Sequence, residues 1–87
     1  AITITEIICS TANNEIAIQL DERASTTPNT AGTDVMAATQ TCDTNTEATT
    51  SFSNAAIAKD APLSLDLDTM TAATDTLRIT LKFTKDD

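Results

Sequence analysis

The stretch Leu63-Ser64-Leu65-Asp66-Leu67-Asp68 alternates apolar and polar side chains strictly, and Leu77-Arg78-Ile79-Thr80-Leu81-Lys82-Phe83-Thr84 repeats the pattern after a gap. A period of two places every apolar side chain of an extended chain on one face. A sheet with one apolar face needs a second layer to cover it. These two segments therefore predict an all-β fold, built either as two stacked sheets or as a small barrel.

Shorter segments with β character precede this region. Residues 2–9 and 16–20 also alternate, and the turn-forming residues 10–14 between them predict an antiparallel hairpin. Short strands are expected at 35–38 and 49–53, and residues 69–76 are expected to close a final hairpin. The prediction is a single domain over residues 1–87, a small antiparallel β-sandwich or barrel of about six to seven strands. Its expected core is formed by Ile4, Ile16, Ile18, Leu20, Leu63, Leu65, Leu67, Leu77, Ile79, Leu81 and Phe83.

The composition limits both stability and partners. The 87 residues include two Phe and no Trp or Tyr, so burial within one protomer is expected to be modest. A net charge of −8 repels phosphate backbones and anionic membranes, so we expect neither nucleic acid nor a membrane as a partner. No apolar run reaches the length of about 20 residues that a membrane-spanning helix needs.

The absence of histidine narrows the chemistry. A chain with no His has no Ser-His-Asp triad, no Cys-His pair and no His-based metal site. A single glycine does not supply a phosphate-binding loop. We therefore predict that the protein is not an enzyme and has no catalytic residues and no cofactor.

Acidic residues offer one candidate metal site. Asp66 and Asp68 share a strand face, and with Asp75 or loop carbonyls they would suit Ca²⁺. The chain lacks the ligand spacing of a known calcium motif, so we favour the simpler interpretation that these carboxylates keep a sheet face solvated. The loop that follows residue 21 contains Gly32, for which a positive φ is expected.

The two cysteines leave two states open. Cys9 and Cys42 are too few for a zinc site. A disulfide between them would contribute about 3–4 kcal/mol of stability through chain entropy. The sequence shows no secretion signal, and free thiols are therefore the favoured state.

Several segments together resemble small β-rich structural proteins of tailed bacteriophages, particularly capsid decoration (cement) proteins and related appendage modules. The similarity covers roughly residues 15–84. It implies a virion protein on the outer capsid surface that stabilises contacts between subunits of the major capsid protein. Its partners would be that protein and copies of itself, as a trimer or a dimer. The residues that carry the resemblance are Gln19-Leu20-Asp21-Glu22-Arg23, Thr27-Pro28-Asn29-Thr30-Ala31-Gly32-Thr33-Asp34-Val35, Phe52-Ser53-Asn54-Ala55-Ala56-Ile57, Pro62-Leu63-Ser64-Leu65-Asp66-Leu67 and Leu77-Arg78-Ile79-Thr80-Leu81.

The alternative function is a secreted or cell-surface β-sandwich module, such as a filament or adhesin subunit. In that case Cys9 and Cys42 would be oxidised, whereas an intracellularly assembled virion protein would keep them reduced. For binding to copies of itself or to the capsid, we expect contacts through the N-terminal strand of residues 2–8, added to a neighbour's sheet edge, and through the loop of residues 23–34. The expected contact residues are Ile2, Ile4, Arg23, Pro28, Asn29 and Gly32.

Overall fold

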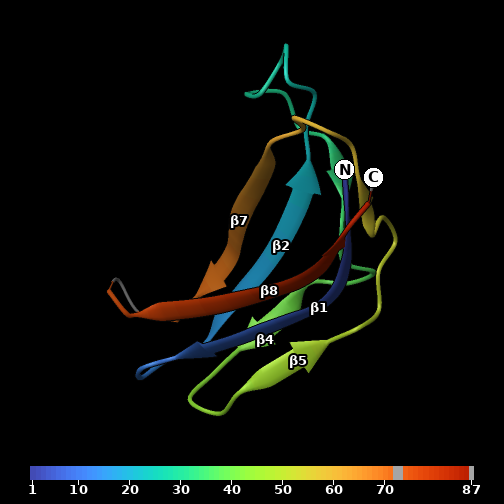
Figure 1. Cartoon of the computed structure of the whole chain (residues 1–87). Helices are drawn as coiled ribbons and strands as arrows, with labels where there is room; N and C mark the ends of the chain where they lie inside the picture. The colour runs from blue at the N-terminus through green and yellow to red at the C-terminus, as the bar shows by residue number, and fades with distance from the viewer. Residues whose placement is uncertain (72–73, 87) are drawn as a thin grey trace.

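The computed structural model describes residues 1–71 and 74–86, and in this range the chain forms eight strands and no helix. They pack as two antiparallel sheets, which confirms the predicted all-β, sandwich-like class (Figure 1). The strands are β1 (Ile2–Thr11), β2 (Ile16–Glu22), β3 (Thr33–Asp34), β4 (Gln40–Cys42), β5 (Glu47–Thr49), β6 (Ala56–Ile57), β7 (Leu63–Met70) and β8 (Leu77–Lys85).

Each sheet is built around one long central strand. In the first sheet, β8 pairs with β1 from Ile2 to Thr11, and the short strands β5 and β6 share the other edge of β1. In the second sheet, β7 pairs with β2 along its length, and β3 and β4 share the opposite edge. The outer strands of the two sheets are therefore β8 and β7 on one side and short strands on the other.

The prediction of two hairpins is wrong. β1 and β2 are consecutive in the chain but lie in different sheets, and so do β7 and β8. The short connections cross between the layers. The long strands pair instead with partners distant in sequence, β1 with β8 and β2 with β7. Alternation of side chains identifies a strand but carries no information on its hydrogen-bonded neighbour.

Two β-bulges reset the alternation. The register of β1 against β8 shifts between Ile4 and Glu6, which leaves Thr5 as the extra residue and brings Ile7 and Cys9 onto the same inward face as Ile4. The register of β2 against β7 shifts at Asp68, so that Met70 lies on the inward face of β7. A bulge adds one residue to one strand and so reverses the parity beyond it.

The core lies between the central strands. Phe52, Leu63, Leu77, Ile79 and Leu81 pack partly buried against it. Three residues expected in the core, Leu65, Leu67 and Phe83, are exposed instead. The buried apolar side chains of the core are Ile4, Ile7, Cys9, Ile16, Ile18, Leu20, Val35, Met36, Cys42 and Ile57.

A disulfide connects the two sheets. Cys9 on β1 and Cys42 on β4 are bonded, with their Cα atoms 5.5 Å apart, and both are buried in the core. This bond contradicts the expectation of two free thiols. Near it, the expected strands at 35–38 and 49–53 are reduced to a single bridge between Met36 and Phe52, while β5 ends at Thr49.

Candidate interaction surface

The inward faces of β7 and β8 are incompletely covered. Leu65, Leu67 and Met70 lie opposite Leu20, Ile18 and Ile16 of β2, so they share the apolar face of the second sheet. Phe83 lies opposite Ile4 in the same way in the first sheet. These four side chains nevertheless remain 42%, 47%, 41% and 53% exposed, respectively. We call these four residues the open apolar face.

The open apolar face lies on the side where the sandwich is not closed. On the opposite side β4 and β5 come into contact, and the Cys9–Cys42 bond lies next to them. β7 and β8 are the outermost strands of their sheets on the remaining side, and Figure 1 shows them splayed apart. A small domain with few large side chains thus closes one seam of its sandwich and leaves the other open.

Both outer strands have a free edge. In the part of the chain that the structure describes, β7 pairs only with β2 and β8 pairs only with β1. Free edges present unpaired N–H and C=O groups that can accept another strand. Neither strand contains a proline.

The two free edges carry opposite charges. The outward residues of β7 include Asp66 and the bulged Asp68, whereas β8 carries Arg78, Lys82 and Lys85, three of the chain's five basic residues. Some of these charged side chains form ion pairs within the protomer. Lys82 Nζ lies 3.0 Å from Glu6 Oε1 on β1, and Arg23 approaches Asp66 to 3.9 Å.

A buried carboxylate fixes the loop of residues 23–32. The Asp21 side chain is only 3% exposed, and its Oδ2 accepts hydrogen bonds from Gly32 N at 2.8 Å and from Arg23 Nε at 2.9 Å. Arg23 also donates to the carbonyl oxygen of Pro28 at 3.0 Å. The Gly32 N–H lowers the pKa of Asp21, burial raises it, and Arg23 lowers it, so that the pKa lies below its usual value.

Gly32 is required for a reason other than the one expected. Its φ is not positive: in the described part of the chain, only Asp60 has a positive φ. A Cβ at Gly32 would instead overlap with the carbonyl oxygen of Glu22. Glycine therefore permits the backbone to close tightly on the end of β2.

The expected contact residues fall into two groups. Arg23, Pro28, Asn29 and Gly32 belong to the fixed 23–32 loop, where Pro28, Asn29 and Gly32 are exposed and Arg23 is half-buried. Ile2 is half-buried, and Ile4 is 2% exposed. Their strand, β1, already has partners on both edges, with β8 along its whole length and with β5 and β6 at residues 7–9 and 2–3. The free edges at β7 and β8 were missed because sequence alternation predicts both faces of a strand but not its place in the sheet.

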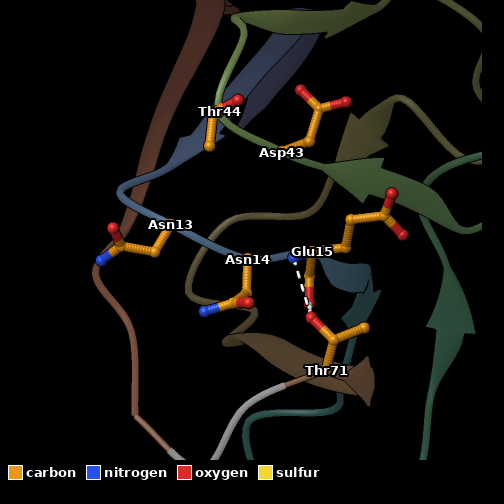
Figure 2. Close-up of a pocket in the computed structure, with 6 residues that line it drawn as sticks. All are labelled: Asn13, Asn14, Glu15, Asp43, Thr44 and Thr71. Carbon is orange, nitrogen blue, oxygen red and sulfur yellow. Dashed lines mark hydrogen bonds between the residues drawn. The ribbon is translucent and has the colours of Figure 1, made fainter.

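The polar residues at the other end of the sandwich do not form a convergent site. Asn13, Asn14, Glu15, Asp43, Thr44 and Thr71 line a shallow hollow in which their polar ends point in different directions (Figure 2). The Thr71 hydroxyl accepts a hydrogen bond from Glu15 N at 3.0 Å. Nearby, hydrogen bonding and repulsion from Asp43 raise the pKa of Glu47.

Two of the candidate calcium ligands, Asp66 and Asp75, make other contacts. Asp75 accepts backbone hydrogen bonds from Asn14 at 2.7 Å and Asn13 at 3.1 Å, and so holds the turn between β1 and β2. Desolvation raises the pKa of Asp75, but these N–H groups and that of Thr76 outweigh it and lower the pKa. Over residues 1–71 and 74–86, no three acidic or cysteine side chains form a metal-binding group.

Within the described residues, no helix is long and apolar enough to cross a membrane. Comparisons of the chain with protein-family models, with curated proteins and with solved structures found no match.

Proposed function

We propose that the protein is a structural module of an assembly exposed to an oxidising environment, such as a secreted or cell-surface filament or adhesin, and that it acts by binding other protein surfaces. The observation that carries this proposal is the buried Cys9–Cys42 disulfide between the two sheets. Disulfides persist in secreted and surface proteins and are rare where glutathione and thioredoxin keep thiols reduced.

The disulfide is part of the construction of the domain. Cys9 lies on a central strand and Cys42 on an edge strand of the other sheet, so the bond ties the sheets together where few large side chains are available. Both sulfur-bearing residues are at most 1% exposed. A bond enclosed in this way serves stability rather than exchange with external thiols, because exchange requires access to a sulfur atom.

The open apolar face supports the binding part of the proposal. Four large apolar side chains lie on the two strands with free edges, although the chain as a whole carries a net charge of −8. Soluble proteins rarely expose contiguous apolar surface without a partner, and a free edge strand is a template for pairing. A protein surface with apolar groups and a free strand would satisfy both requirements.

A capsid decoration protein is the second candidate. The outer surface of a released virion is also an oxidising location. The observation that favours this function is the 23–32 loop, which projects from one end of the sandwich in Figure 1 and is fixed by Asp21 and Arg23. A fixed, exposed loop suits docking on a larger shell, in this case the major capsid protein.

Thiol labelling combined with immunogold electron microscopy tests the proposal in cells that produce the protein. Cells are quenched with an alkylating reagent before lysis, and an antibody against the chain locates it. We expect Cys9 and Cys42 to remain unlabelled until a reductant is added, with gold on the cell surface or on released fibres. Gold on released capsids would select the second candidate. Alkylated thiols in a cytoplasmic pool would contradict both.

A further inference from the structure

We infer that the open apolar face is covered by a second copy of this chain, in a two-fold dimer in which β7 of each copy pairs with β8 of the other. This inference rests on the proposed function in that it names the partner of the same surface. Two open sandwiches would thereby join into one closed structure with a shared core.

The first argument is the position of the two free edges. β7 and β8 are the outer strands on the same side of the molecule, because the contact of β4 with β5 closes the other side. A copy that covers only one edge would leave either Phe83 on β8 or the three apolar side chains of β7 in water. A second copy that faces the first can pair with both edges at once and cover both sets of apolar side chains.

The second argument is strand direction. Thr71, just after β7, donates to Glu15 O, and Ala12 donates to Thr76 O, just before β8. Both contacts lie at the turn between β1 and β2, so β7 ends where β8 begins and the two strands run in opposite senses (Figure 1). A two-fold axis roughly parallel to the strands gives each strand of the second copy the same direction as in the first. It therefore places β7 antiparallel to β8 of the second copy at both seams.

The third argument is charge, which selects between the possible pairings. A different two-fold axis would pair β7 with β7, with Asp66 and Asp68 of both copies along one seam, and β8 with β8, with Arg78 and Lys82 along the other. Like charges on neighbouring strands destabilise a sheet, whereas opposite charges stabilise it. Pairing of β7 with β8 brings the acidic edge to the basic edge twice. Closed two-fold assemblies of this kind are the commonest among soluble homo-oligomers.

Paired charge reversals test the dimer in the oxidised full-length protein. Asp66→Lys/Asp68→Lys makes both edges basic, and Arg78→Glu/Lys82→Glu makes both edges acidic. We expect sedimentation equilibrium to show a dimer for the wild type, with dissociation constants at least tenfold higher for each variant alone. An equimolar mixture of the two variants should regain the dimer, because each seam then joins a basic edge to an acidic one.

A matched control places the same charge change elsewhere. Glu15→Lys/Asp34→Lys alters two exposed acidic residues off these edges and should leave the dimer intact. Circular dichroism and the retained disulfide verify that every variant folds. If the charge variants do not fold, the dimer is tested by measuring amide hydrogen exchange of the wild type at several protein concentrations. Amides of β7 and β8, but not of the 23–32 loop, should become more protected as the protein concentration rises.

Three results would overturn the inference. These are a monomer at several hundred micromolar, a dimer unaffected by both charge reversals, or variants that fail to associate when mixed although both are folded. A monomer that is nevertheless found oxidised at the cell surface would leave the proposed function standing and exclude only the second copy as partner. A dimer of a protein that is found reduced in the cytoplasm would support the second copy as partner and exclude the proposed function.

Discussion

Asp21 shows how a single buried carboxylate organises the loop of residues 23–32. Its Oδ2 receives the Gly32 N–H and the Arg23 guanidinium, whereas its Oδ1 has no hydrogen-bond partner among the described residues. A buried charge is tolerated only when its partners offset the loss of hydration. The position of the 23–32 loop therefore depends on the charge of this one side chain.

We predict that Asp21→Asn lowers the free energy of unfolding by about 1–3 kcal/mol at pH 7, because hydrogen bonds to a charged group are lost. The pKa of Asp21 is lowered in the folded state, so the contribution of its charge is complete above the unfolded-state pKa of about 3.9 and is lost as the pH falls through the folded-state pKa. Urea unfolding followed by circular dichroism should show the gap between wild type and variant narrowing below about pH 4. A gap that stays constant from pH 7 to pH 2.5 would show that the charge is not the cause.

We predict that Gly32→Ala destabilises the protein by about 2–3 kcal/mol. The new Cβ would overlap with backbone atoms of Glu22, and these cannot move aside as the end of a flexible side chain could. The neighbouring Ala31 is exposed, and Ala31→Gly is the matched control with a change below about 1 kcal/mol. Thermal unfolding of both variants measures the difference. Equal melting temperatures for Gly32→Ala and wild type would contradict the close approach seen here.

At the scale of the elements, the sequence predicted where the long strands lie but not which side chains they bury. Alternation correctly identified residues 63–68 and 77–84 as strands. Uninterrupted alternation over residues 2–9 would place Ile8 on the face of Ile4, whereas the bulge at Thr5 brings Ile7 and Cys9 to that face. A bulge depends on how two strands meet, and no local feature around Thr5 indicates it.

We predict that truncation of an inward-facing side chain lowers the free energy of unfolding much more on a central strand than on an outer strand. Ile18→Ala removes a fully buried side chain from β2 and should cost about 2–5 kcal/mol. Leu67→Ala, directly opposite on β7, should cost at most about 1 kcal/mol in the monomer, because its side chain is already half exposed. Chemical denaturation at low protein concentration measures both. A cost for Leu67→Ala as large as that for Ile18→Ala would mean that β7 is covered within the protomer.

At the scale of the whole molecule, the scarcity of large apolar residues predicted modest burial within one protomer, and the structure leaves free sheet edges at β7 and β8 rather than at β1. The difference arises because consecutive strands cross between sheets, so that β1 becomes central. The pairing of β1 with β8 spans almost the whole chain and cannot be read from local pattern. For the same reason, only the fold brings Cys9 close to Cys42.

The last prediction concerns this long-range cross-link. Cys9 and Cys42 are 33 residues apart, and in the chain-entropy model their bond stabilises the fold by about 3–4 kcal/mol, a large part of the stability of so small a domain. We expect reductant to lower the urea midpoint of the wild type by the corresponding amount. The Cys9→Ala/Cys42→Ala variant should be less stable than the oxidised protein and insensitive to reductant, which controls for other effects of the reagent. Because the sheets are otherwise joined by a core without large aromatic residues, loss of the bond should also speed exchange of amides in both β1 and β4. Unchanged stability after complete reduction would show that packing alone holds the two sheets together.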